Sequence, residues 1–494
     1  MKPTNLNQWK IAAAFAAAFF LHQTTQAQYL GVTLGYDYNG NGYDELAGPY
    51  QTKTNTPMYN PDGSAPNSTF NEWASELKQS GVDFVCPNLR GSRPKTDVNP
   101  TNIAPLVDAL NSVGNVTKLA IFDDNASSWV AQWNLAHGNG YDSSPALDIG
   151  NTNTWKYIYD YNYKLFYQTV PDTNRFKING RPVIIIWSGH PGVITDMQGN
   201  YSRAMTYVRN KCQADFGFNP YIIVPQDAID YDTTLAAVAD AAHDWFSPPT
   251  KSYSLTTLHG VKIGVAVAQF QTSTSDPTRY INPNHGTTLD NGLAATVGAG
   301  ALLTLCEGFT DWNEEAALLR VRNLAPDGSA LSYSQTLYDY PNQRIDLLRK
   351  YSTVPFPSNL RYEAEGCDSF GGAAGGNGKV NYFRNGNIAI GQNTDGYDGW
   401  HVGWLNSGEW FEWKDVPLNN SPHFKVRIAT PNSGRTAHFV IDGVAQPSQT
   451  LPNTGSWSTY TTYDFGTYGT YSKSYHTVRI VFDNGGVNFN WWSR

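Results

Sequence analysis

Eight short apolar stretches in the first 351 residues constrain the fold more than any other feature of this chain. Several are continuously apolar, which is typical of strands that are covered on both faces. Helix-like stretches separate them, and two of these end near a glycine, at Gly114 and Gly217. Alternation of strands with helices indicates parallel pairing. The apolar stretches are 29–35, 82–87, 118–122, 182–187, 221–225, 241–246, 261–269 and 301–306.

Eight such strands predict a (β/α)8 TIM barrel over residues 28–351, with long loops. A doubly wound open sheet is the alternative. Such an open sheet indicates nucleotide binding when a glycine-rich turn leads from a strand into a helix. The glycine-containing segment 37–42 follows the first strand but precedes no helical pattern, so we favour the barrel.

The residue pattern of the sequence changes after residue 351. Pro355 and Pro357 interrupt regular structure, so residues 352–359 are predicted to form a linker. From residue 360 onward, short alternating strands are separated by Gly, Asn and Ser. This pattern predicts an all-β sandwich over residues 360–494.

The N-terminal residues 1–27 are typical of an export signal. Lys2 and Lys10 carry positive charge, residues 11–21 are almost wholly apolar, and Thr25-Gln26-Ala27 supplies small residues for cleavage. The apolar run is too short to span a bilayer. We therefore expect a secreted, extracellular protein that does not enter a membrane.

Composition excludes several other classes of function. A net charge of −8 and the absence of a basic stripe argue against nucleic acid as a partner. The four cysteines form no CxxC pair, which argues against a zinc site of that kind. Cys86 and Cys306 lie in apolar stretches and are predicted to be buried free thiols. The 30 Tyr, 15 Trp and 22 Phe favour large cores or sugar recognition, and we expect a monomer.

The C-terminal part carries the most specific motifs. Tyr362-Glu363-Ala364-Glu365 opens it, residues 404–410 read WLNSGEW, residues 451–457 read LPNTGSW, and residues 488–491 read NFNW. In this order they resemble carbohydrate-binding module families 6 and 35. The resemblance implies a jelly-roll sandwich with a structural calcium ion held by Glu363 and Glu365. It also implies a sugar cleft formed by Trp457 and Asn488, with Tyr397 or Trp400 as the opposite wall.

Carboxyl groups dominate the predicted strand ends of the barrel, where TIM-barrel active sites lie. Segment 302–315 is the richest, because an apolar strand leads to Glu307 and the following turn carries Asp311 and Glu314. Glycoside hydrolysis needs two carboxyl groups, one as acid and one as base or nucleophile. Glu314 has an alternative role at the start of a helix. The catalytic candidates are Glu307, Asp124, Asp227, Asp311 and Glu314.

Other side chains at these strand ends suit substrate binding. Aromatic rings cover the apolar face of a sugar, and polar groups bind its hydroxyls. His190 is expected either to bind a sugar hydroxyl or to play a structural role. The substrate-binding candidates are Asp37, Arg90, Trp187, His190, Trp245, Gln269 and Trp312.

Segments 34–37 and 311–314 resemble a bacterial and fungal barrel family that is similar to plant-polysaccharide hydrolases and is labelled xylosidase/arabinosidase-like. The resemblance implies a glycoside hydrolase that cleaves a cell-wall polysaccharide and needs no cofactor for catalysis. Two alternatives remain. One is a metal-dependent carbohydrate esterase or deacetylase, and the other is a glycan-binding protein without catalysis. Metal ligands for the esterase would come from Asp123, Asp124, His190, His243 and Asp244.

Overall fold

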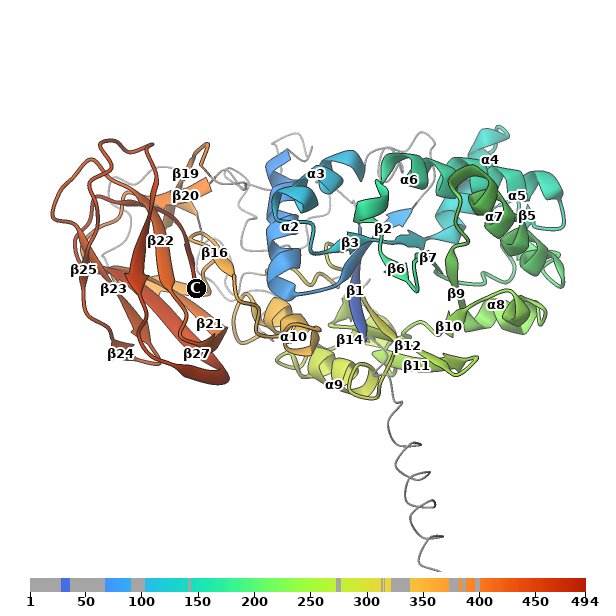
Figure 1. Ribbon diagram of the computed structural model, residues 1–494. Coiled ribbons are helices and arrows are strands. Elements are labelled where there is room, and N and C mark those ends of the chain that lie inside the picture. Colours follow the sequence, from blue (N-terminus) through green and yellow to red (C-terminus); the bar gives the residue numbers. More distant parts are fainter. Residues whose placement is uncertain are drawn as a thin grey trace, which may run out of the picture.

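A computed structural model describes residues 28–35, 67–89, 103–140, 144–271, 277–311, 314, 316–320, 338–372, 382–383, 388–395 and 400–494. The described part contains one large mixed sheet between Tyr29 and Glu307 and two antiparallel sheets between Arg361 and Ser493. Figure 1 shows the large sheet surrounded by helices on one side of the molecule and the antiparallel sheets on the other.

Parallel strands form most of the large sheet, in the order β10-β9-β7-β4-β2-β1-β15-β12, with β11 following β12. Each of the eight predicted apolar stretches overlaps one of these parallel strands, so those strand predictions are confirmed. Their side chains are almost all buried, as expected for strands covered on both faces. The bounds are β1 (Tyr29–Leu34), β2 (Phe84–Leu89), β4 (Ile121–Asp123), β7 (Arg181–Ile186), β9 (Tyr221–Pro225), β10 (Ala241–His243), β12 (Val261–Val267) and β15 (Leu303–Glu307).

The prediction of a (β/α)8 TIM barrel is wrong. Between β10 and β12 the chain forms β11 (Tyr253–Leu258), which pairs antiparallel with β12, where the eightfold pattern requires a helix. His259 and Gly260 join these two strands with φ of 53° and 77°, the left-handed geometry that suits a tight hairpin. β10 lies beside both β11 and β12 but its only described pairing is with β9, so the mixed sheet is nearly closed rather than a barrel of eight parallel strands.

Helices connect most of the parallel strands. The helix-like stretch predicted to end near Gly217 is confirmed as α7, which ends at a left-handed Gly217 with φ of 80°. The stretch predicted to end near Gly114 corresponds to α3. The helices are α2 (Asn67–Ser80), α3 (Ala104–Ser112), α4 (Gln132–Ala136), α5 (Thr152–Ile158), α6 (Lys164–Thr169), α7 (Asn200–Phe216), α8 (Gln226–Tyr231), α9 (Thr287–Thr296) and α10 (Gln343–Tyr351). None of the described helices is long and apolar enough to cross a membrane.

Short strands complete this part of the chain. β3 (Lys118–Leu119) pairs with β2, and β6 (Lys177–Ile178) pairs antiparallel with β7. Two small sheets consist of β5 (Leu147–Asp148) with β8 (Ile194–Thr195) and of β13 (Phe270–Gln271) with β14 (Tyr280–Ile281).

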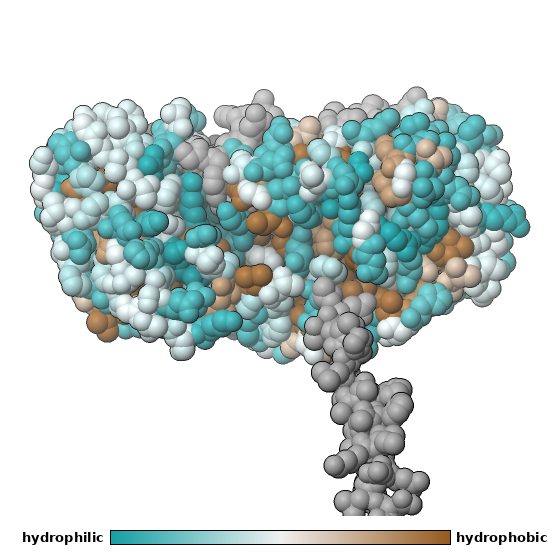
Figure 2. Space-filling model, in the orientation of Figure 1, coloured by the Kyte–Doolittle hydropathy of each residue, from teal (hydrophilic) through white to brown (hydrophobic). Residues whose placement is uncertain are grey.

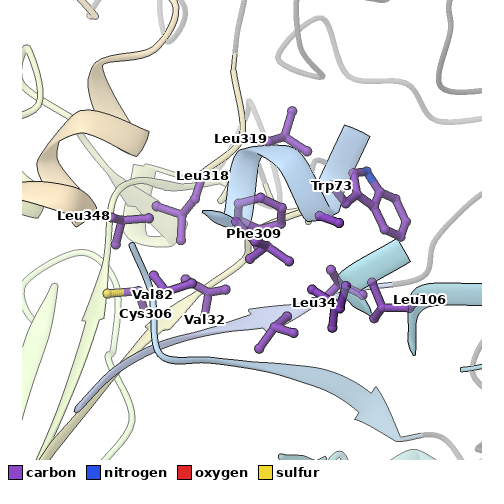
Figure 3. Packing of buried hydrophobic residues seen from close by; sticks show 14 of the residues in the cluster. Val32, Leu34, Trp73, Val82, Leu106, Cys306, Phe309, Leu318, Leu319 and Leu348 are labelled. Atoms are coloured by element: carbon purple, nitrogen blue, oxygen red, sulfur yellow. The ribbon is translucent and has the colours of Figure 1, made fainter. Parts of the chain in front are cut away.

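A hydrophobic core fixes the carboxyl end of β15. Figure 3 shows Val32 and Leu34 of β1 packed with Phe309, which follows β15, and close to Trp73 of α2. All four side chains are at most 1% exposed. Burying each side chain of this size stabilises the fold by about 1.5–3 kcal/mol. The backbone on both sides of Glu307 is therefore held rigidly.

The C-terminal part is a β-sandwich, as predicted. Trp413, Phe424, Phe439, Phe489 and Trp492 fill the space between its two sheets. One sheet contains β16 (Arg361–Glu363), β18 (Tyr382–Phe383), β19 (Ile388–Gln392), β20 (Trp400–Gly403), β22 (Phe424–Ala429), β26 (Thr461–Gly466) and β28 (Asn488–Ser493). The other contains β17 (Ser369–Gly371), β21 (Glu409–Asn420), β23 (Thr436–Ile441), β24 (Val444–Ala445), β25 (Gln449–Thr450) and β27 (Tyr471–Phe482).

The two parts contact each other through α2, α10 and the start of the sandwich, and Figure 1 shows both helices facing β16 and β21. Asn342 donates to Asp368 Oδ1 at 2.7 Å, and Gln79 donates to the carbonyl of Arg361 at 2.7 Å. Gly366 lies against Arg320, since a Cβ at this glycine would be 1.4 Å from Nη1. These polar contacts are buried or partly buried, and one hydrophobic cluster includes residues of both parts. On the face shown in Figure 2, both parts are mostly hydrophilic, with small scattered apolar patches.

Candidate functional site

The carboxyl ends of the parallel strands bring polar side chains to one edge of the large sheet, called here the carboxyl edge. Ligands of sheets with parallel strands bind outside this end, because the connecting loops leave a crevice there. The residues at or just after the strand ends include Thr33, Asp124, His190, Asp227, Trp245, Gln269 and Glu307.

Glu307 ends β15 and is held by the neighbouring strand β1. The Thr33 hydroxyl donates to Glu307 Oε2 at 2.8 Å and accepts from the Gly308 N–H at 2.7 Å. Burial raises the pKa of Glu307 well above its usual range, and the nearby Asp311, Glu314 and Asp124 raise it further against the effect of Thr33. The Glu307 carboxyl therefore favours its protonated form.

Asp311 and Glu314 join Glu307 in an acidic group. One carboxylate oxygen from each of the three residues lies within 4.8 Å of the others. The turn that carries them is compact, because the Glu314 N–H donates to Asp311 Oδ1 at 3.1 Å and Gly308 has φ of 86°. The structure thus brings together three of the five predicted catalytic residues. The alternative role of Glu314 at the start of a helix is not what the structure shows: residue 314 lies in a turn.

Asp123 and Asp124 follow one another but have different surroundings. Asp123 is fully buried and accepts hydrogen bonds from Ser128, from Trp129 Nε1 at 2.8 Å and from the Tyr163 hydroxyl at 2.6 Å. Burial raises the pKa of Asp123 to about 6, opposed by these donors. Asp124 accepts from the Ser127 hydroxyl at 3.0 Å, and its charge reaches Glu307 and His190. Asp123 is thus a structural anchor, and Asp124 faces the carboxyl edge.

Asp227 orients the turn that carries His190. Its Oδ1 accepts from the Gly189 N–H at 2.9 Å, and its Oδ2 accepts from the Ser188 hydroxyl at 3.0 Å. Gly189 must be a glycine here, since a Cβ would lie 2.8 Å from the Ala228 nitrogen. Both oxygens of Asp227 therefore serve the turn, which favours a positioning role over a catalytic one.

His190 adopts a left-handed backbone conformation with φ of 45°, which is uncommon for a residue other than glycine. Its Nε2 atom is buried and has no hydrogen-bond partner in the described part of the chain. Burial lowers the pKa of His190, against the charges of Asp124 and Asp227, so the ring favours its neutral form. Trp187 contacts the imidazole edge-on, with ring centroids 4.8 Å apart.

The remaining predicted substrate-binding residues divide into two sets. Trp245 is partly buried and stacks on Phe122 with centroids 5.3 Å apart, and Gln269 is fully buried. Asp37, Arg90 and Trp312 lie outside the described residues.

The sandwich presents a second candidate site, around Asn488. Its side-chain amide donates to the carbonyl of Trp457 at 2.9 Å, and the Trp457 side chain is 48% exposed. The backbone of Gly403 also approaches Asn488, since a Cβ there would lie 3.0 Å from Oδ1. Trp404 is 45% exposed and has φ of 53°.

The two exposed tryptophans thus belong to segments that both contact Asn488. Sequence reasoning did not assign Trp404 to the cleft, although this residue opens the 404–410 motif. Trp400, predicted as an opposite wall, is partly buried and packs on the sandwich core, and Tyr397 lies outside the described residues.

Glu363 and Glu365, the predicted calcium ligands, are at most 1% exposed. Arg361 contacts both oxygens of Glu363, with Nε–Oε1 of 2.6 Å and Nη2–Oε2 of 3.0 Å. Asn490 is also fully buried, and its Oδ1 has no hydrogen-bond partner among the described residues. Carboxylate and amide oxygens are the donors that calcium prefers, but both oxygens of Glu363 are already held by Arg361, so calcium binding here stays a prediction.

Comparisons with known proteins identify the C-terminal part through a family model. Residues 384–494 match the family model described as Carbohydrate binding module (family 35). The chain is similar to the C-terminal CBM6 of LamC from Zobellia galactanivorans, with 21% identity over 27% of this chain and 97% of that chain, and a TM-score of 0.22. A module of Cellvibrio mixtus lichenase 5A, solved with cellotriose, has 24% identity over 27% and 93% of the two chains and a TM-score of 0.22.

A family 6 module from Clostridium cellulolyticum, solved with xylose, matches with 24% identity over 27% of this chain and 93% of that chain, at a TM-score of 0.22. No curated protein matches the sequence. Residues 26–369 match a different family model, which covers more than half of the chain. The carbohydrate-binding module is therefore attached to a chain that belongs to the family described as Domain of unknown function (DUF5010).

Proposed function

We propose that this chain is a secreted glycoside hydrolase that cleaves a polysaccharide with a pair of carboxyl groups and holds that substrate with its C-terminal module. The observation that carries the proposal is the meeting of carboxyl groups from β15, the turn after it and the end of β4 at one edge, with Thr33 fixing the orientation of Glu307. Secretion rests on the export-signal pattern of residues 1–27.

Glu307 has the properties of the general acid. Its environment favours the protonated carboxyl, which is the form that delivers a proton to the leaving oxygen. Because Thr33 holds Oε2, the proton is delivered from Oε1. Asp311 and Glu314 contribute negative charge that keeps the proton on Glu307.

Asp124 is the proposed partner carboxylate. It directly follows β4, which is separated from β15 by β2 and β1 in the sheet order, so the two carboxyl groups come from different strand ends. Its charge reaches both Glu307 and His190. The Asp124 carboxylate then attacks the sugar or activates water, depending on its separation from the acid in the complex.

Trp187, His190 and Trp245 are the proposed sugar contacts. Aromatic side chains bind the apolar face of a pyranose, and the neutral His190 ring offers a nitrogen without a described partner to a hydroxyl. In the module, we assign the same task to Trp404 and Trp457, with Asn488 between them.

The test is a polysaccharide panel incubated with the wild-type chain and a Glu307→Gln variant, with release of reducing sugar as the readout. Loss of a general acid lowers the rate by about 10²–10⁴-fold. Asp244→Asn is the matched control, because Asp244 follows β10 at the same edge but pairs with Lys251 at 2.7 Å. Normal turnover by Glu307→Gln with an intact fold would remove Glu307 from the mechanism.

A metal-dependent carbohydrate esterase is the second candidate, favoured by the three carboxylates of the acidic group, which together could hold a divalent cation. The ligands expected from the sequence are less suitable. Asp123 is already bound by three donors, and His243 Nε2 lies 2.7 Å from the carbonyl of Ile186. Release of acetate, rather than of reducing sugar, from an acetylated glycan in a manner dependent on added cation would support this candidate.

A further inference from the structure

Residues 316–320, called here the return segment, fold back onto the turn that carries the acidic group. The Leu318 N–H donates to the Gly308 carbonyl at 3.1 Å, and the Ala316 N–H donates to the Asp311 carbonyl at 2.9 Å. A Cβ at Gly308 would lie 2.5 Å from the Ala316 Cβ and 2.9 Å from its carbonyl oxygen, so the two segments are tightly packed. The placement of Asp311 therefore depends on the return segment.

Helices α2 and α10 hold the far end of the return segment, at the buried Arg320. The Arg320 backbone N–H donates to Glu76 Oε2 at 3.0 Å, and its Nε donates to Glu76 Oε1 at 2.8 Å. Arg320 Nη2 also donates to Glu72 Oε2 at 3.1 Å. From α10, Arg344 Nη2 donates to the Leu319 carbonyl at 3.3 Å. Both helices thus fix the position of the segment.

The sandwich completes this enclosure with the backbone of Gly366. A Cβ at this residue would lie 1.4 Å from Arg320 Nη1 and 2.6 Å from Cζ. Asn342, which precedes α10, donates to the Gly366 carbonyl at 3.0 Å and to Asp368 Oδ1 at 2.7 Å. Gly366 does not have a left-handed φ, so it is the lack of space, and not the backbone conformation, that requires a glycine here.

We propose that the start of the sandwich positions the turn that carries Asp311, acting through Gly366, Arg320 and the return segment. The sandwich is then a structural support of the carboxyl edge, and this role is separate from its sugar cleft. Arg320 is a positioning residue, because it acts through the return segment. The expected effect on turnover rests on the proposed function, whereas the effect on the return segment does not.

The test is Gly366→Ala in the full-length chain. The added methyl group takes the space of the Arg320 guanidinium without straining the backbone, and it lies in the sandwich rather than beside the carboxyl edge. Gly140→Ala is the matched control, because a Cβ at Gly140 meets nothing within 4 Å and its φ is likewise not left-handed. Circular dichroism reports whether each variant folds.

Hydrogen–deuterium exchange, followed by mass spectrometry, reports on the return segment without any substrate. The N–H groups of Ala316, Leu318 and Leu319 all donate to carbonyls of the turn. We expect Gly366→Ala to exchange these amides at least about ten-fold faster, because a displaced Arg320 no longer anchors the segment. Peptides from β9 should exchange as in the wild type, and Gly140→Ala should change neither. Unchanged exchange of the return segment in a folded Gly366→Ala protein would overturn the proposal.

Turnover of a short soluble substrate is the second readout, with rates divided by the folded fraction. We expect Gly366→Ala to lower kcat by about 10–100-fold with KM unchanged, because a small misplacement of reacting groups slows the chemical step. Retention on an insoluble glycan should not change. Faster exchange with a wild-type kcat would also overturn the proposal. A wild-type chain that hydrolyses no glycan would instead refute the proposed function, and the exchange rates alone would then decide the positioning role.

If Gly366→Ala does not fold, Asn342→Ala replaces it. This substitution removes the side-chain hydrogen bonds to the Gly366 carbonyl and to Asp368, so it loosens the contact without adding volume. We expect the same pattern with a smaller increase in exchange. Wild-type exchange of the return segment in this variant would equally refute the proposal.

Discussion

The two candidate sites of this molecule expose their key side chains to different degrees. At the carboxyl edge, Asp124 is 7% exposed and the carboxyl of Glu307 is enclosed enough for its pKa to rise. In the sandwich, Trp404 and Trp457 are both nearly half exposed. The difference follows from the physics of each task. Enclosure from water is what changes the proton affinity of an acid, whereas a polysaccharide on a surface requires aromatic faces that are open to it.

The contrast between the two sites assumes that each works independently of the other. Asp124→Asn tests this assumption and has the largest expected effect on turnover. Removing the partner carboxylate should lower turnover by about 10²–10⁴-fold, because the attacking or water-activating group is lost. Retention of the chain on an insoluble glycan should not change. The measurement pairs reducing-sugar release with a pull-down on the same glycan. A loss of retention that parallels the loss of activity would show that the edge itself holds the substrate.

Trp457→Ala and Trp404→Ala test the sugar-binding site of the sandwich. Their expected effect, on glycan binding, is smaller. Each should weaken binding to the glycan by about 30-fold, the cost of about 2 kcal/mol that is typical when a central aromatic contact is truncated. Turnover of a short soluble substrate should be unaffected. Affinity electrophoresis measures the binding, and Tyr161→Ala is the control, since Tyr161 is 38% exposed but belongs to the N-terminal part. Full retention by Trp404→Ala would confine the cleft to Trp457 and Asn488.

Thr33→Val tests how the surroundings of Glu307 set its pKa, and it has the smallest expected effect on activity. The Thr33 hydroxyl lowers the pKa of Glu307 against burial, so its removal should raise this pKa further. The protonated acid would then persist to higher pH, and the alkaline limb of the kcat/KM profile should move upward. The Gly308 N–H also loses its acceptor, at a cost of about 1–3 kcal/mol in the free energy of unfolding. A profile that shifts downward would contradict the assignment of Glu307 as the acid.

The sequence was sufficient to locate strands but not to determine how the sheet closes. Continuous apolar runs such as 221–225 and 301–306 identify buried parallel strands directly. Tyr253–Leu258 contains no buried apolar run, since Ser254 is its only buried residue. The sequence does not reveal it as a strand, because it forms by pairing with β12 through the turn at His259 and Gly260. That hairpin takes the place of a helix and turns the predicted barrel into a mixed sheet.

The candidate sites were also only partly predictable from the sequence. The apolar strand before Glu307 and the dense carboxyl groups after it were readable, and the structure does bring Glu307, Asp311 and Glu314 together. The role of Asp227 was not readable, because its partners Ser188 and Gly189 lie almost forty residues earlier in the chain. Trp404 was missed for a different reason, since it was assigned only to the motif that identifies the module.

Gly366 limits which modules this family member can accept. Arg320 fills the space that any side chain at position 366 would need, and Asn342 donates to the Gly366 carbonyl at 3.0 Å. A foreign sugar-binding module fused at this point would have to offer glycine in its first turn and leave that carbonyl available. Recombination between relatives should therefore exchange α2, the segment around Arg320 and the module as one inherited unit.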